Sequence, residues 1–203
     1  MNTQDFYINN YSYINTTSKE DISFIPLLLK RKLSALNRSA FYTLNQTYND
    51  NVDLVVYASR YGEFDKLIKI INQYKTDNEV SPVLFSSSVH NSTVGAFLSF
   101  CHSSKPYMAL AAVKDTLPNA ILTSLANNKT CLLCYGDYIN ETPISISVLF
   151  SRKENSGKHC RLIQNNINDN KNINYIESFK DFLSGKTDNV QLYNFKLEEI
   201  KDE

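Results

Sequence analysis

A continuous apolar run followed by an amphipathic helix pattern is the feature of this sequence that most narrows its fold. Residues 52–59, VDLVVYAS, are typical of a strand buried on both faces of a parallel or mixed sheet. After a short RYG turn the sequence changes to helical spacing, with apolar side chains at Phe64, Leu67, Ile68 and Ile71. Because strand and helix patterns keep alternating, the sequence predicts a layered α/β fold, with a mixed sheet covered by helices.

Hydrophobic spacing and turn residues predict the other elements. A tyrosine-rich strand spans Phe6–Ile14, and one long amphipathic helix opens near Pro26 and covers residues 25–48. Residues 81–100 combine a short apolar stretch with a helix that contains glycine, and Pro143 marks a hairpin turn. Further strands are predicted at 107–113, 129–137, 144–153, 159–163 and 190–197, further helices at 116–128 and 175–185, and an asparagine-rich loop at 165–174.

Length and charge limit the class of protein. The 203 residues, 42% of them hydrophobic, predict a single domain over 1–203, with 151–203 forming a divergent strand-loop-helix-strand tail. Lys and Arg number 21 and are balanced by 21 Asp and Glu, which argues against a nucleic-acid partner. No apolar run approaches the roughly 18 residues of a membrane span. The first residues lack the pattern of a signal peptide, so we expect a cytoplasmic location.

The four cysteines do not have the spacing of a metal site. Cys131 and Cys134 lie in a predicted strand, where residues three apart point to opposite faces and cannot share one ion. The pairs Cys101–His102 and His159–Cys160 are adjacent in sequence, unlike the usual ligand spacings. We therefore expect reduced, largely buried thiols and predict neither a metal nor a cofactor.

Four segments between Phe24 and Gly136 keep one order and matching spacings: LKRKLSALNRSAFYTL, VVYASRYGEFDKL, SPVLFSSSVHNSTVGAFLSF and KPYMALAAVKDTLPNAIL. Together they resemble the N-terminal half of a β-ketoacyl synthase. The likeness is greatest to the small ketosynthase-like proteins found beside aryl polyene and related lipid pathways. The resemblance implies a thiolase-like layered fold, in which the fourth segment supplies the strand and the elbow that carries the cysteine nucleophile.

The elbow is where this sequence departs from the family. A helix N-terminus lowers the pKa of a thiol at such a turn, and the thiolate accepts an acyl chain from a carrier protein. When the fourth segment is aligned with the family pattern from its proline, Lys114 falls at the cysteine position and Asp115 follows it. The chain also ends about where the second half of a ketosynthase, with both catalytic histidines, would begin. We therefore predict a pseudoenzyme that lacks the Cys-His-His set.

The sequence leaves open two enzymatic alternatives to a pseudoenzyme. A Schiff-base lysine needs a desolvated pocket, whereas Lys114 precedes Asp115, a natural N-cap and a neutralising neighbour. Cys101 and His102 form the other candidate pair, although adjacent helical residues point about 100° apart. Any activity of this kind would be of the acyltransferase type.

His90, Asn91 and Gly95 lie where the family shapes the region under its active site. Because no nucleophile is present for them to assist, a structural role is the favoured interpretation. The two polar side chains would satisfy backbone groups at a strand-to-helix turn, and Gly95 would permit close helix packing.

The strand before the elbow is the predicted dimer contact. Ketosynthases are dimers, and the resemblance implies that this strand pairs across the two-fold axis; the alternative is an interior strand of one domain. Small alanines allow two backbones to approach, and an apolar edge strand is an aggregation hazard when unpaired. The residues concerned are Tyr107, Met108, Ala109, Leu110, Ala111 and Ala112.

These features together predict a non-catalytic, chain-length-factor-like subunit that pairs with a full-length β-ketoacyl synthase, as a heterodimer or a higher hetero-oligomer. The pathway would be aryl polyene, fatty acid or polyketide biosynthesis. The alternative is a binding module for the acidic acyl carrier protein, because a basic group falls on one predicted helix. In that interpretation Arg31 and Arg38 share a helix face, and the docking residues are Lys30, Arg31, Lys32 and Arg38.

Overall fold

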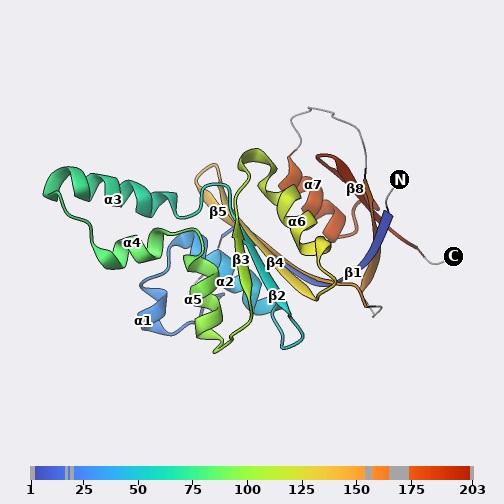
Figure 1. Cartoon of the computed structure of the whole chain (residues 1–203), viewed down its shortest axis with the longest axis horizontal. Coiled ribbons are helices and arrows are strands. Elements are labelled where there is room, and N and C mark those ends of the chain that lie inside the picture. Colours follow the sequence, from blue (N-terminus) through green and yellow to red (C-terminus); the bar gives the residue numbers. More distant parts are fainter. Residues whose placement is uncertain (1–2, 17, 19–20, 154–156, 165–173, 202–203) are drawn as a thin grey trace.

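The computed structural model describes residues 3–16, 18, 21–153, 157–164 and 174–201, which are built around an eight-stranded sheet (Figure 1). The strands lie in the order β3-β2-β4-β5-β1-β6-β8-β7. β2 is parallel to β3 and β4, whereas the other neighbouring pairs are antiparallel, so the predicted mixed sheet is confirmed. The strands are β1 (Thr3–Ile14), β2 (Leu54–Ala58), β3 (Tyr107–Leu110), β4 (Cys131–Ile139), β5 (Thr142–Ser151), β6 (Lys158–Gln164), β7 (Asn189–Leu192) and β8 (Phe195–Glu199).

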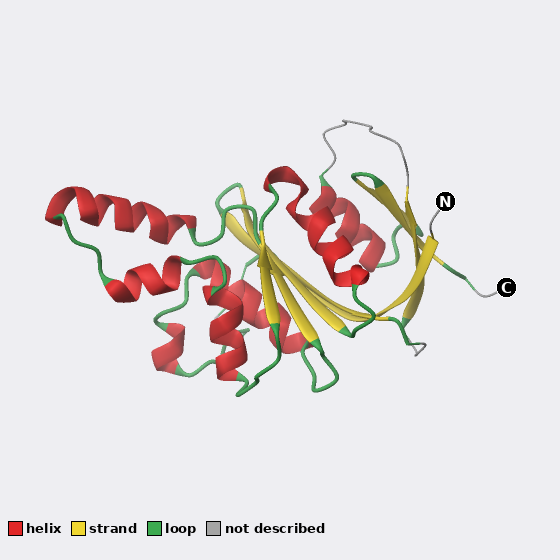
Figure 2. Cartoon of the chain, in the orientation of Figure 1, coloured by secondary structure: helices red, strands yellow, loops and turns green. Residues whose placement is uncertain are grey.

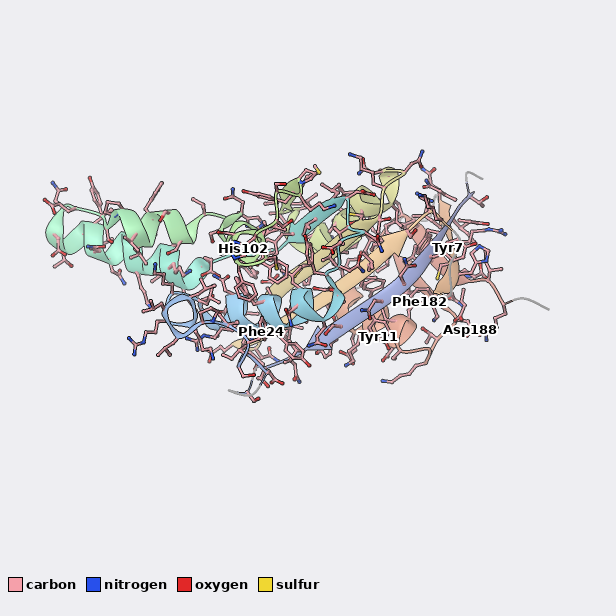
Figure 3. The ribbon with its side chains drawn as sticks, turned by 90° about the horizontal axis from the view of Figure 1, so that it is seen from below. Tyr7, Tyr11, Phe24, His102, Phe182 and Asp188 are labelled. Carbon is pink, nitrogen blue, oxygen red and sulfur yellow. The ribbon has the colours of Figure 1, made fainter. Side chains whose placement is uncertain are left out.

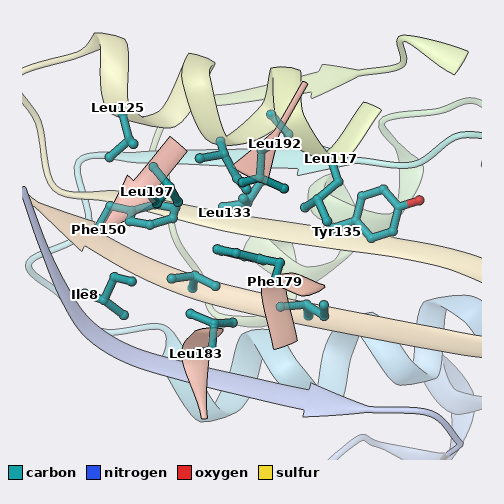
Figure 4. Close-up of a cluster of buried hydrophobic side chains, with 14 of the residues drawn as sticks. Ile8, Leu117, Leu125, Leu133, Tyr135, Phe150, Phe179, Leu183, Leu192 and Leu197 are labelled. Atoms are coloured by element: carbon teal, nitrogen blue, oxygen red, sulfur yellow. The ribbon is translucent and has the colours of Figure 1, made fainter. Parts of the chain in front are cut away.

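Helices cover both faces of the sheet (Figure 2). α6 (Thr116–Ala126) and α7 (Tyr175–Leu183) pack on one face, and α2 (Ala35–Thr47) and α5 (Ser92–Phe100) pack on the other. Figure 4 shows Leu117 of α6 and Phe179 of α7 meeting side chains of the sheet in the first of these cores. On the second face, the rings of Phe41 and Phe97 meet edge to face with centroids 5.4 Å apart.

The alternation of side chains along β4 explains why its first half, residues 131–135, is continuously apolar. Cys131 and Leu133 point into the core under α6 and α7, while Leu132 and Cys134 point into the core under α2 and α5. Both faces of the strand are therefore buried, as its continuous apolar pattern predicts. The two cysteines lie in opposite cores, which confirms that they cannot share a metal ion.

The single helix predicted over 25–48 is wrong, because the chain forms two helices there. α1 (Leu27–Lys30) is one short turn, and α2 begins afresh after Ser34. The Ser34 hydroxyl accepts a hydrogen bond from the Asn37 N–H at 3.0 Å and so caps α2. Helical spacing of the apolar residues continues across this break, which explains why hydrophobic periodicity alone does not reveal it.

Residues 82–88 are helical, so His90 and Asn91 do not lie at a strand-to-helix turn. α4 (Pro82–Ser88) opens with proline in its first turn, and the Ser81 hydroxyl accepts a hydrogen bond from the Leu84 N–H. The polar pair therefore joins α4 to α5.

Two turns also differ from the sequence prediction. The β4–β5 hairpin is present, but its turn is Asn140–Glu141, where both residues have positive φ (47° and 65°), and Pro143 is already paired in β5. The final strand predicted at 190–197 is a second hairpin, β7–β8, which turns at Tyr193 with φ 49°. The predicted loop at 165–174 lies outside the described residues, except for Asn174, which caps α7.

α3 (Phe64–Asp77) and α4 form an arm, residues 64–88, that projects from the layered body (Figure 1). The apolar side chains that predict α3 face outward and are 40–49% exposed. The opposite face of α3 instead carries a buried ion pair, in which Lys66 Nζ lies 2.6 Å from Glu63 Oε2. Lys66 also donates to the Ser87 carbonyl at 3.0 Å, and the Ser34 hydroxyl donates to Glu63 at 2.9 Å. This network ties the arm to the start of α2.

Within the described part of the chain, no helix is both long enough and apolar enough to cross a bilayer.

Candidate functional site

The strand-to-helix elbow predicted from the sequence is present between β3 and α6. A 3₁₀ turn, Val113–Asp115, connects them, and Val113 has φ 50°. A positive φ is rare and strained for a β-branched residue, and a strained turn of this kind lifts a side chain out of the sheet edge. The Val113 side chain is 69% exposed, and Lys114 beside it is also exposed. The elbow therefore presents an apolar side chain and an amine.

Thr116, rather than Asp115, stabilises the start of α6. Asp115 occupies the N-cap position, but its carboxylate makes no capping hydrogen bond, so the predicted cap is wrong. The Thr116 hydroxyl donates to the Val113 carbonyl at 2.7 Å and accepts from the Ala112 N–H at 2.9 Å. These two bonds hold the backbone on either side of the strained residue.

His90 contacts the carboxyl end of β3. Its Nε2 lies 3.0 Å from the carbonyl oxygen of Leu110, which also accepts from the Ser59 N–H at 3.2 Å. Since a carbonyl only accepts, Nε2 must donate, and this fixes the tautomer of the neutral ring. A Cβ at Gly62, whose φ is +58°, would lie 2.9 Å from His90 Nδ1, so glycine is needed there. These contacts support the structural role inferred for His90.

Asn91 and Gly95 both lie near Tyr107 of β3. The Asn91 side-chain amide donates to the Tyr107 hydroxyl at 3.4 Å. A Cβ added at Gly95 would meet that hydroxyl at 3.6 Å, an ordinary contact. The close helix packing expected at Gly95 is therefore not required by the structure.

All four cysteines have pKa values above the ordinary range of a thiol. Burial raises the pKa of Cys131 to about 11 and that of Cys160 to about 12. Burial also raises the pKa of Cys101 and of Cys134. A catalytic cysteine needs the opposite shift, because the thiolate is the nucleophile. Across the described residues, no three His, Cys, Asp or Glu side chains are grouped so that they could hold a metal ion.

The histidines are dispersed and do not assemble around a thiol. His102 follows the C-terminus of α5, whereas His159 lies on β6 and stacks on Tyr7, with ring centroids 4.7 Å apart. Figure 3 shows Tyr7 and His102 in well-separated parts of the molecule. Cys101 is the C-cap residue of α5, with its N–H bonded to the Phe97 carbonyl. The geometry thus gives no support to a Cys101–His102 catalytic pair.

Alkylation of the folded chain is expected to be slow. At pH 8, a thiol of pKa about 11, such as Cys131, has about one thiolate per thousand molecules. Iodoacetamide should therefore modify only the half-buried Cys101 in the native chain, and all four cysteines after unfolding. Peptide mass mapping gives the readout. Rapid labelling of one site near neutral pH would identify an activated cysteine and contradict this description.

The outer side of β3 has no neighbouring strand in the described sheet. The Pro106 and Leu110 carbonyls accept hydrogen bonds from β2, so the even-numbered residues of β3 face β2. The backbone groups of Tyr107 and Ala109 consequently point away from the sheet. The Tyr107 and Met108 side chains are 40% and 46% exposed. This is an apolar sheet edge of the kind that proteins normally cover.

The basic residues of 30–38 do not share one helix face, so that part of the prediction is wrong. Lys30 lies in α1, Arg31 and Lys32 lie in the break between helices, and Arg38 lies in α2. The Arg38 guanidinium donates to the Lys30 carbonyl at 3.1 Å. Lys30, Arg31 and Arg38 nevertheless line one pocket of about 380 Å³ with Ile22 and Leu27. Lys32 lines a separate groove bounded by α4 and α5.

One protein family matches most of this chain. The model of the beta-ketoacyl synthase N-terminal domain matches residues 8–162, which is more than half of the chain. The chain therefore belongs to this family. Comparison with curated proteins finds no match.

The solved structures that resemble the chain include these two. One is the ketosynthase in complex with its chain length factor from Xenorhabdus doucetiae, with a TM-score of 0.69 and 18% identity over 97% of this chain and 99% of that one. The other is the ishigamide ketosynthase/chain length factor, with a TM-score of 0.63 and 8% identity over 78% of this chain and 66% of that one. The predicted thiolase-like layered fold of a ketosynthase is confirmed.

Proposed function

We propose that this chain is a non-catalytic ketosynthase-like subunit that pairs with an active β-ketoacyl synthase, in the manner of a chain length factor. The observation that carries the proposal is the elbow. Its strained turn is kept at Val113, yet the side chains it presents are valine and lysine, and all four thiols have raised pKa values. A polypeptide that retains this frame without an activated thiol is suited to a structural partner.

The open edge of β3 supports the choice of partner. A second strand there would bond to the outward backbone groups of Tyr107 and Ala109 and cover Met108. Each of the two similar structures named above is described as a ketosynthase with a chain length factor. The proposal includes a cytoplasmic heterodimer or a higher hetero-oligomer. It places the subunit in aryl polyene, fatty acid or polyketide biosynthesis, with an influence on the length of the acyl chain.

An activity assay with each subunit omitted tests this function. The ketosynthase encoded in the same gene cluster is expected to condense acyl and malonyl groups only when this chain is present. A cysteine-directed ketosynthase inhibitor such as cerulenin should label the ketosynthase and leave this chain unlabelled. Full activity of the ketosynthase alone, or covalent labelling of this chain, would refute the proposal.

A second candidate function is the docking of an acidic acyl carrier protein. It is favoured by the pocket where Lys30, Arg31 and Arg38 converge without any carboxylate in the lining. Arg31→Glu should then abolish a salt-sensitive association with the carrier protein in the absence of any ketosynthase. Association that is unchanged by this substitution would exclude the pocket as the docking site.

A further inference from the structure

A groove of about 670 Å³ lies where the arm meets the body of the protein. Its walls come from the start of α2 and the loop before it, from both helices of the arm, from α5 and from Tyr107 of β3. This volume is in the range of sites that bind a ligand or an anchoring side chain. We call it the lysine groove, because its lining includes Lys32, Lys66 and Lys69.

The charge of the lysine groove is one-sided. None of the side chains that line it is a carboxylate. Lys66 is neutralised by Glu63 at 2.6 Å, but Lys32 and Lys69 have no ion-pair partner within the described part of the chain. Two cationic side chains therefore converge on an otherwise mainly apolar hollow. Such a site complements an apolar group with a carboxylate beside it.

The rim of the groove favours a protein surface over a small amphiphile as its occupant. Three apolar side chains of the lining stand open to solvent: Val83 is 69% exposed, Tyr107 40% and Val89 38%. A fatty acid inside the groove would leave this rim uncovered, whereas a protein surface would cover the rim and the hollow together.

Tyr107 connects the groove to the open sheet edge. It lines the groove with its side chain, and its backbone belongs to the outer side of β3. A strand that pairs with β3 would therefore arrive directly beside the groove. The Asn91 amide, bonded to the Tyr107 hydroxyl at 3.4 Å, helps to orient the ring between the two surfaces.

We propose that the lysine groove is a second contact site for the ketosynthase partner, which inserts an apolar side chain flanked by a carboxylate between Lys32 and Lys69. This inference rests on the proposed function and adds to it the chemistry of the partner's surface. Binding at β3 supplies backbone hydrogen bonds that any strand can make. The groove supplies the charge and shape that select one partner.

The test compares ketosynthase binding by the unmodified chain and by charge variants. The double variant Lys32→Glu/Lys69→Glu is expected to bind about tenfold more weakly at low salt, and the difference should shrink at about 1 M salt, where screening extends only roughly 3 Å. Lys75→Glu/Lys129→Glu is the matched control, since it reverses the charge of two exposed lysines that do not line the groove. Val83→Ser should weaken binding by about tenfold through lost apolar contact, with little dependence on salt.

The outcomes separate this inference from the proposed function. If the ketosynthase does not bind the unmodified chain, the proposed function fails. If it binds the unmodified chain and both groove variants equally, the function stands and the inference is wrong. Titration with palmitate in the absence of ketosynthase is the third arm. Suppose that palmitate binds saturably to the unmodified chain, that Lys32→Glu/Lys69→Glu abolishes this binding, and that the same variant still binds the ketosynthase normally. The groove would then be a lipid site, and the inference would be overturned.

Discussion

Ala109→Pro is expected to disrupt the complex with the ketosynthase while leaving the chain folded. The Ala109 N–H points away from β2, so its loss breaks no hydrogen bond within the sheet, and proline is tolerated at such edge positions. A partner strand would lose that donor and meet the proline ring. A penalty of about 3 kcal/mol corresponds to roughly 100-fold weaker binding.

Two further substitutions control this experiment. Ala109→Val keeps the N–H and should bind nearly as well as the unmodified chain. Met108→Pro lies on the side of β3 that faces β2, so it should damage the sheet itself and lower the melting temperature. Isothermal calorimetry and thermal unfolding give the two readouts. Tight ketosynthase binding by folded Ala109→Pro would exclude strand pairing at β3.

Glu63→Gln is expected to cause a large loss of stability for a conservative change. The Glu63 and Lys66 side chains are only 3% and 10% exposed, and their charged atoms lie 2.6 Å apart. Removing one partner leaves a buried, uncompensated charge, which typically costs about 3–5 kcal/mol. The free energy of unfolding, measured by urea titration, should fall by about 3 kcal/mol.

The chain contains a matched control for burial. Glu177 and Lys180 have the same i,i+3 spacing and the same 2.6 Å separation, but they are 51% and 28% exposed. Glu177→Gln should therefore cost less than about 1 kcal/mol. Adding Lys66→Met to Glu63→Gln should recover most of the loss, because the Ser87 carbonyl still accepts from the Ser92 hydroxyl. Equal effects of Glu63→Gln and Glu177→Gln would contradict the account of this ion pair.

The sheet was largely predictable from the sequence because its strands are governed by local patterns. In residues 54–58 and 131–135, successive side chains point to opposite faces of the sheet, and both faces are buried. A continuous apolar run is therefore diagnostic of these central strands. The β4–β5 hairpin was also recognisable, although its turn lies at Asn140 and Glu141, which have positive φ, and not at Pro143. Turn position depends on register, which hydrophobic pattern alone does not fix.

The helices show where local patterns are insufficient. The apolar spacing of residues 25–48 continues across the break between α1 and α2. The helix itself is interrupted there, because the Ser34 side chain caps the start of α2. α3 has the spacing of a core helix, yet Phe64, Leu67 and Ile68 face solvent while Lys66 is buried. Periodicity identifies an apolar face, but it does not identify whether that face meets the same chain or a partner.

The candidate site was predictable in position but not in geometry. The order of segments predicted the strand-to-helix elbow that the structure contains at Val113–Asp115, while the assignment of Lys114 to the cysteine position stays a prediction. It did not reveal that Val113 carries the backbone strain, because a positive φ at a β-branched residue has no sequence signal. The lysine groove was also missed, since Lys32 lies in the loop before α2 while Lys66 and Lys69 lie on α3, and they meet only in the folded chain.

The central claim is that this chain has no complete active site of its own and serves a ketosynthase by pairing with it. The most direct measurement is the native mass of the chain after co-expression with the ketosynthase of its gene cluster. The account predicts a species with both polypeptides in equal numbers and no free ketosynthase dimer in excess. If the ketosynthase is found entirely as its own homodimer, and this chain is always found separate from it, the account is contradicted.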